Sequence, residues 1–270
     1  MACALNQRPI VLLRGLVREQ RHWGAFKQLL QQRYPARPVL SFDVPGNGQL
    51  SHLPSAWHIA ELRQSLRIQL RLCDVDVRNV DLLAISMGGM LALDWARAHP
   101  EEVHSMLLIN PSNAAFSPFY QRLNYQSYLK LLGCIFARTA ASRERRIMQL
   151  SSRFATLHQA ELDDWCSWAE QCPVSLSNAF KQLVAAARFK LELAPSVPLL
   201  LLASRRDQLV NVRCSQVMAQ TWGCELRCHP SAGHDLALDA PSWTCQQIDQ
   251  WFASLEDSSS ELHSIQKDGS

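Results

Sequence analysis

A serine at the end of an apolar run is the residue in this chain best suited to nucleophilic chemistry. Residues 82–90 read Leu-Leu-Ala-Ile-Ser-Met-Gly-Gly-Met, so the run ends on Ser86 among small side chains. A serine hydroxyl attacks an acyl carbon only when a turn exposes it and a base takes its proton. Ala84 and Gly88, two positions before and after, are small enough for such a turn. The pattern predicts a strand, a sharp turn at Ser86 and a following helix; the alternative is a serine that only caps this helix.

Two further residues have the types that would activate such a serine. Asp207 follows the apolar run 197–203, which places a carboxylate at the carboxyl end of a predicted parallel strand. His234 follows the short run 225–229, and Gly233 before it lets the loop bend toward the sheet edge. An aspartate in this place orients a histidine, which then removes the serine proton. Judged singly, Asp207 could be a loop or cap residue and His234 an ordinary loop histidine.

Two backbone amides are candidates for stabilising the negative oxygen that forms during acyl transfer, because that oxygen needs preorganised N–H donors. One is the amide of Met87, directly after the nucleophile. The other is the amide of Leu16, in the loop that follows the first predicted strand, where Gly15 permits close backbone approach. With these, the sequence supplies a nucleophile, a base, an orienting acid and an oxyanion hole.

Strand-like and helix-like patterns alternate in the first part of the chain and again near its end. Apolar runs of strand length cover residues 9–14, 38–42, 80–85, 103–109, 197–203 and 225–229. Helical periodicity covers residues 21–34, 55–72 (with Ser55 as N-cap), 87–98, 213–222 and 241–255. This alternation predicts an α/β fold, a mostly parallel sheet with helices on both faces.

The segment 113–190 interrupts this rhythm with helical patterns alone, over residues 119–136, 142–154, 161–170 and 177–189. It is too long for a loop, so we expect a helical cap inserted into the sheet domain. The predicted core is then residues 1–112 and 191–255. The polar, Ser-rich tail 256–270 is expected to be disordered.

The composition suits a globular protein with a sizeable core. The 270 residues are 47% hydrophobic and 19% charged, and 27 Lys and Arg against 24 Asp and Glu are too balanced to indicate nucleic-acid binding. The start of the chain lacks a signal-peptide pattern, and no run has the length of a membrane span. The nine scattered cysteines form no zinc-ligand pattern. We therefore expect a cytoplasmic protein with free thiols, no metal and no cofactor.

Over nearly all of residues 9–255 the chain resembles the α/β-hydrolase fold superfamily. The matching motifs are Arg14-Gly15, the loop Asp-Val-Pro-Gly-Asn-Gly at 43–48, the turn at 84–89, and the chain order Ser, Asp, His. The sequence departs from the family at Arg14, where many relatives have histidine. It departs again at the first glycine of the turn, which is alanine here.

The resemblance implies that Ser86 is the nucleophile, His234 the base and then the acid, and Asp207 the orienting residue. Within the superfamily the chain looks most like small carboxylesterases such as the pimeloyl-[acyl carrier protein] methyl ester esterases of biotin biosynthesis. That likeness implies a small-molecule or carrier-linked ester as substrate. Three alternatives stay open: an acyltransferase of the homoserine O-acetyltransferase type, which residues 86–96 also resemble, a C–C hydrolase, and a non-catalytic binding protein of this fold.

A cluster of basic residues marks the predicted cap, with only Glu144 against it. Its members are Arg138, Arg143, Arg145, Arg146 and Arg153. One interpretation is a solvated helix face. The other is a docking surface for an acidic partner such as an acyl carrier protein, held by charge complementarity.

Overall fold

A single parallel sheet forms the centre of the computed structural model, which describes residues 8–73 and 78–268, the last eleven as backbone only. The strands are β1 (Ile10–Leu13), β2 (Val39–Ser41), β3 (Val80–Ile85), β4 (Val103–Ile109), β5 (Leu199–Ser204) and β6 (Glu225–His229). Their order across the sheet is β2-β1-β3-β4-β5-β6, and each neighbouring pair runs parallel. The predicted α/β fold with a parallel sheet is confirmed.

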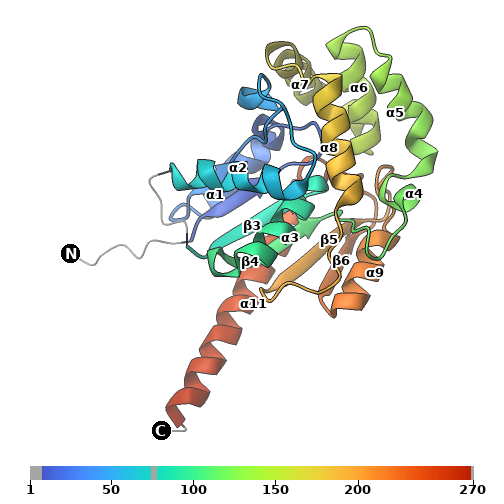
Figure 1. Cartoon of the computed structure of the whole chain (residues 1–270). Coiled ribbons are helices and arrows are strands. Elements are labelled where there is room, and N and C mark those ends of the chain that lie inside the picture. The colour runs from blue at the N-terminus through green and yellow to red at the C-terminus, as the bar shows by residue number, and fades with distance from the viewer. Residues whose placement is uncertain (1–7, 74–77, 269–270) are drawn as a thin grey trace.

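Helices cover both faces of this sheet (Figure 1). One face carries α2 (Ile59–Arg71), α3 (Met87–Ala98) and α9 (Arg213–Trp222), and the other carries α1 (Gly24–Arg33) and α11 (Pro241–Asp268). Successive strand side chains alternate between the faces, so Val11 joins one core and Leu12 the other. Because both faces are covered, the central strands β1 and β5 are runs of buried apolar residues rather than alternating polar and apolar ones.

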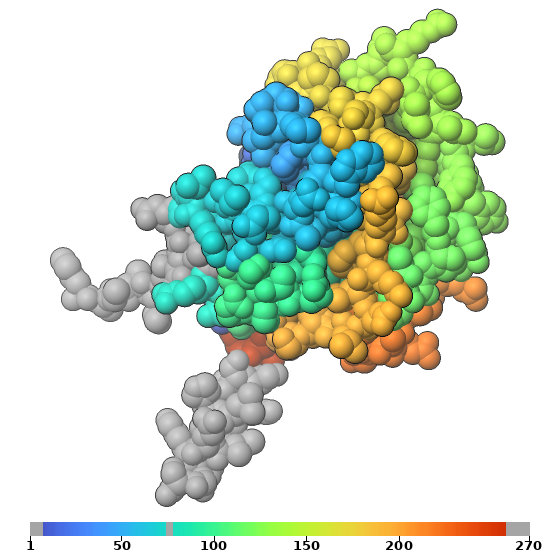
Figure 2. All heavy atoms as spheres, viewed as in Figure 1, coloured from blue at the N-terminus to red at the C-terminus, as the bar shows by residue number. Residues whose placement is uncertain are grey.

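The segment between β4 and β5 is helical, as its sequence pattern predicts. It contains α4 (Phe119–Arg122), α5 (Tyr128–Ile135), α6 (Ala140–Ser151), α7 (Gln159–Gln171) and α8 (Leu176–Arg188). In the space-filling view these green and gold helices lie over one end of the molecule, with α8 against the blue segment before α2 (Figure 2). There, the Asn178 side chain donates to Leu53 O (3.1 Å) and accepts from the Ser55 amide (2.9 Å). The helices α4 to α8 together are called the cap below.

Two expectations about helix ends differ from the structure. Helix α2 begins at Ile59, and Ser55 is not its N-cap because its amide is held by Asn178 in the cap. Helix α11 continues to Asp268, where the polar composition predicts a disordered tail from residue 256. Residues 256–268 contain no glycine or proline, so nothing in the sequence ends the helix once the apolar part is anchored.

No helix in the described part of the chain combines the length and apolar character that a membrane span requires.

A partly buried charged cluster links α3, the helix that follows Ser86, to its neighbour α2. Glu102 accepts hydrogen bonds from Arg67 on α2 (2.5 and 2.8 Å) and from Trp95 on α3 (2.8 Å). Burial alone would raise the pKa of Glu102, but the hydrogen bonds from Arg67, Trp95 and Arg71 outweigh it and lower the pKa to about 2.

Replacing this carboxylate should weaken the fold in a pH-dependent way. The depressed pKa of Glu102 means that its stabilising effect is complete above about pH 4.5 and is lost as the pH falls toward about 2. We expect Glu102→Gln to lower the free energy of unfolding by about 2 kcal/mol at pH 7. Urea titrations of both proteins should show the difference shrinking below pH 4.5. Glu101→Gln, at an exposed neighbouring position, is the control; a Glu102→Gln effect equal at pH 7 and pH 3 would contradict the assignment.

Candidate active site

Ser86 sits in a strained turn between β3 and α3. Its backbone has φ 58° and ψ −122°, a region that non-glycine residues rarely adopt. Every other residue from 80 to 96 is buried, whereas Ser86 is partly exposed. Such strain persists only where the surroundings enforce it, and here its result is a serine side chain held out of the sheet.

The surroundings that enforce this turn are two close backbone approaches. A Cβ atom on Gly88 would overlap Leu13 O and lie 2.8 Å from Arg14 O, so α3 starts directly against the end of β1. A Cβ atom on Gly15 would lie 3.1 Å from the Cβ of Ser86. The methyl group of Ala84, where the family pattern has glycine, is fully buried in the apolar core, so the turn accommodates it.

His234 and Asp207 form a hydrogen-bonded pair at the same end of the sheet. The Nδ1 atom of His234 lies 2.6 Å from Oδ2 of Asp207, and their side chains are 9% and 1% exposed. The other oxygen of Asp207 accepts from the Leu209 and Val210 amides, at 2.7 and 3.0 Å, which fixes the carboxylate. Burial lowers the pKa of His234, but the charge and hydrogen bond of Asp207 outweigh it, so the pKa lies above its ordinary value. The pair leaves Nε2 of the ring available for a second partner.

The loop that carries His234 is fixed to the cap by a buried carboxylate that sequence reasoning missed. Asp239 accepts from the amides of Gly233 (2.7 Å) and Arg153 (2.8 Å) and from the hydroxyl of Ser152 (2.5 Å). A Cβ atom on Gly233 would lie 2.7 Å from Ser151 O and 2.9 Å from the Arg153 nitrogen. A glycine is therefore needed at position 233 because the backbone of the cap passes close to it, and not for the loop bend that the sequence suggested.

The loop after β1 presents the Leu16 amide. Residues 15–18 form a turn closed by the Arg18 amide and Gly15 O (3.3 Å), with Val17 at φ 52°. Gln182 of α8 is fully buried, accepts from the Val17 amide (3.0 Å) and donates to Asn47 (2.8 Å), so the cap holds this strained loop. Gln182 lies 165 residues from Val17, and no motif marked it.

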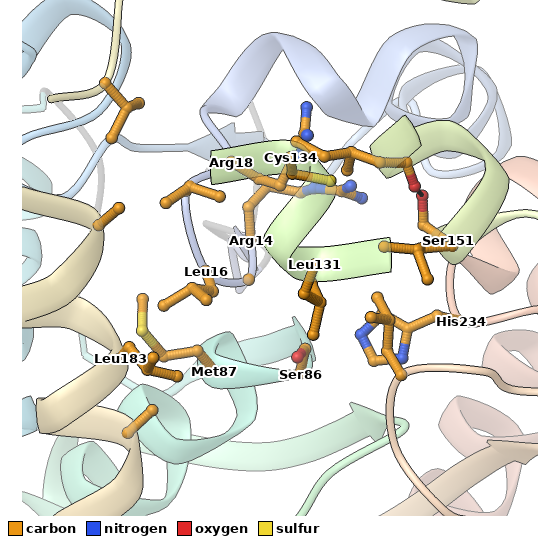
Figure 3. Close-up of a pocket in the computed structure, with 18 of the residues that line it drawn as sticks. Arg14, Leu16, Arg18, Ser86, Met87, Leu131, Cys134, Ser151, Leu183 and His234 are labelled. Carbon is orange, nitrogen blue, oxygen red and sulfur yellow. Dashed lines mark hydrogen bonds between the residues drawn. The ribbon is translucent and has the colours of Figure 1, made fainter. Parts of the chain in front are cut away.

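These residues open onto one cavity of about 760 Å³ beneath the cap. In Figure 3, Ser86, Met87, Leu16 and His234 line it together, with Leu131 and Leu183 of the cap facing them. Neither the Leu16 nor the Met87 amide donates a hydrogen bond to any residue that the structure describes. The Met87 amide also belongs to the first turn of α3, where the helix dipole favours negative charge.

The arginine cluster of the cap divides between two places. Arg143 lines the cavity and lies 3.9 Å from Glu144, which also pairs with Arg18 at 2.6 Å. The remaining members are exposed and have no acidic partner within the described residues: Arg138, Arg145, Arg146 and Arg153.

The described residues give little indication of metal binding. His99, Glu101 and Glu102 lie close enough together to share an ion, but they lie outside the cavity. The carboxylate of Glu102 already accepts hydrogen bonds from Arg67 and Trp95. The eight cysteines in the described part of the chain are free thiols.

The fold agrees with the comparisons with known proteins. A model of the alpha/beta hydrolase fold family matches residues 8–241, and the chain belongs to that family. A Drosophila melanogaster protein named as a probable serine hydrolase is 29% identical over 106 residues, 39% of this chain but only 31% of its own length.

Two solved structures share the fold at low sequence identity. A carboxylesterase structure from the ammonia-oxidizing thaumarchaeon Nitrososphaera gargenis superposes with TM-score 0.75 at 16% identity, covering 96% of this chain and 94% of that one. A hydrolase from Pseudomonas aeruginosa PA01 gives TM-score 0.71 at 18% identity, covering 91% and 90%.

The two glycines after Ser86 should respond oppositely to alanine. Gly88→Ala forces a methyl group into the backbone of β1, so we expect a loss of about 2 kcal/mol in unfolding free energy. Gly89→Ala meets nothing closer than 3.5 Å and gains helix propensity, so its stability should be unchanged or rise by up to about 1 kcal/mol. Thermal unfolding of both variants checks this; equal effects would show that the approach of α3 to β1 is looser than described.

Proposed function

We propose that this protein is a serine hydrolase that cleaves a carboxylic ester through an acyl-enzyme on Ser86. One observation carries the proposal: His234, which is hydrogen-bonded to Asp207, lines the same cavity as the strained, partly exposed Ser86. An orienting acid bound to Nδ1 leaves Nε2 of the histidine as a base, and this is the arrangement that serine nucleophiles need. The family and the hydrolase names of its relatives support the same conclusion.

The proposed reaction assigns each group one task. Nε2 of His234 removes the Ser86 proton as Oγ attacks the ester carbon, and the amides of Leu16 and Met87 stabilise the resulting oxyanion. His234 then gives the proton to the leaving alcohol, which departs as the acyl-enzyme forms. A water molecule, deprotonated by His234 in turn, attacks the acyl carbon and releases the acid and the free serine.

The cavity favours a large apolar acyl group. Its cap wall is mostly aliphatic and aromatic, with Tyr128, Leu131, Ile135, Trp165 and Trp168 beside the charged Arg122, Arg143 and Glu144. A volume of about 760 Å³ lies within the range of sites that enclose whole small molecules. Burial of such an acyl chain would supply binding energy, roughly 0.8 kcal/mol for each methylene removed from water.

A carrier-linked methyl ester is the finer form of this proposal. The exposed arginines on the outside of the cap offer positive charge without acidic partners in the described residues, which suits an acidic carrier protein. The resemblance to small methyl ester esterases points the same way.

Removing the nucleophile should abolish hydrolysis and leave the fold intact. We expect Ser86→Ala to reduce kcat/KM on p-nitrophenyl esters by at least about 10³-fold, because no acyl-enzyme can form. Alanine keeps the Cβ atom and the strained φ of Ser86 and loses only the hydroxyl, so the melting temperature should stay close to that of the wild type. Assays over esters of increasing acyl length test the cavity at the same time. Wild-type-like turnover by Ser86→Ala would refute the proposed function.

Charge reversal on the outer cap tests the carrier-linked substrate. We expect Arg145→Glu/Arg146→Glu to lower kcat/KM on a carrier-linked ester about tenfold at low salt, because complementary charge speeds association. Hydrolysis of a small p-nitrophenyl ester should be unchanged. Arg213→Glu, on an exposed position of α9, is the matched control. Equal kinetics of the cap variant and the control on the carrier-linked ester would reject the docking surface.

A further inference from the structure

A buried ion pair joins the two loops that carry the oxyanion donor and the catalytic histidine. The guanidinium of Arg14 contacts both carboxylate oxygens of Asp235, at 2.6 and 3.4 Å. The two side chains are 4% and 3% exposed, and the residues lie 221 positions apart in the chain. The guanidinium also lies over the ring of Trp23, 4.8 Å from its centroid, so its plane is held by packing as well as charge.

Each end of this pair lies next to a residue of the site. Arg14 directly precedes Gly15 and Leu16, and its own carbonyl forms part of the wall against Gly88. Asp235 directly follows His234, accepts from the Leu238 amide at 3.3 Å and donates its own amide to Ser151 O at 2.9 Å. The ion pair is thus a direct side-chain bond between the oxyanion loop and the histidine loop. Figure 3 shows Arg14 across the cavity from His234.

We propose that Arg14 and Asp235 are positioning residues whose ion pair holds the Leu16 amide and the His234 ring at a fixed separation. This inference rests on the proposed hydrolase function. Arg14 occupies the position where the chain departs from the histidine of many relatives. An arginine fork reaches two carboxylate oxygens at once, so it restrains both the distance and the orientation of the two loops. A displacement of about 1 Å between catalytic groups is enough to cost about a hundredfold in rate.

The pair also places opposite charges beside His234. The charged groups that act on this ring are Asp207 from the β5–α9 loop, Asp235 from its own loop and Arg14 from the β1 loop. Asp235 raises the pKa of His234 and Arg14 lowers it. Removing one charge should therefore move the histidine titration, and removing both should bring it back.

Three variants test the proposal: Arg14→Met, Asp235→Asn and the double variant. The readout is the pH profile of kcat/KM on a p-nitrophenyl ester, whose acid limb follows deprotonation of His234. We expect the limb to move up by about half a pH unit or more in Arg14→Met and down by a similar amount in Asp235→Asn. In the double variant it should return toward the wild-type position. All three should lose about tenfold or more in kcat, because the two loops are no longer tied.

Two further variants separate positioning from simple loss of stability. Arg67→Met breaks the buried pair with Glu102 outside the cavity, so its melting temperature should fall while its kcat and pH profile stay as in the wild type. Arg14→Lys keeps the charge without the fork, so the pH profile should stay while kcat falls. This variant preserves the test if Arg14→Met does not fold.

Wild-type kcat in folded Arg14→Met and Asp235→Asn, or acid limbs that move in the same direction, would overturn the positioning role. Ser86→Ala belongs in the same series. Activity surviving in Ser86→Ala would overturn the proposed function and this inference with it. Loss of activity in Ser86→Ala, beside unchanged kinetics in the Arg14 and Asp235 variants, would overturn only the ion pair's role.

Discussion

The start of helix α3 against the end of strand β1 is the contact on which the site depends. Only a glycine at position 88 lets the helix approach the carbonyls of Leu13 and Arg14 this closely. The approach accompanies a positive φ at Ser86 and places the Met87 amide in the first turn of α3, where it lines the same cavity as Leu16. The proposed nucleophile and the proposed oxyanion donors are thus positioned by one packing constraint, at the point where the strand order of the sheet reverses between β1 and β3.

The rest of the molecule holds the strained and buried groups that this constraint creates. Gln182 in α8 supports the turn at Val17, and Asp239 fixes the cap segment to the histidine loop. Arg14 and Asp235 connect the two loops directly. The cap is therefore more than a cover over an apolar cavity. Gln182 within α8 bonds the loop after β1. Ser152 and Arg153, directly after α6, bond Asp239, which also holds the amide of Gly233 beside His234. We therefore expect that a change in the packing of the cap would also change the positions of the loops that form the site.

Local sequence patterns predict the sheet and most of its helices because the signals are short-ranged. The apolar runs match the strands within one or two residues. The turn at Ser86 is marked by the small residues Ala84 and Gly88, two positions before and two positions after it. Helix α2 starts later than expected because a cap residue, Asn178, holds the amide of the predicted N-cap Ser55. Gln182 and Asp239 were missed for the same reason: each acts on a backbone amide or hydroxyl that is remote in the chain, and a polar residue in a helix carries no local sign of such a partner. Arg14 was noticed as a departure from the family, but its partner Asp235 becomes evident only when the loops meet.

The most direct test of the account is covalent labelling by a fluorophosphonate. An activated serine oxygen displaces the fluoride and keeps the phosphonyl group, which mass spectrometry of the digested protein locates. The account predicts one adduct, on Ser86, at a rate that falls as the pH drops and His234 becomes protonated. A protein that stays unlabelled, or that is labelled elsewhere while Ser86 remains free, would contradict the claim that this turn presents an activated nucleophile.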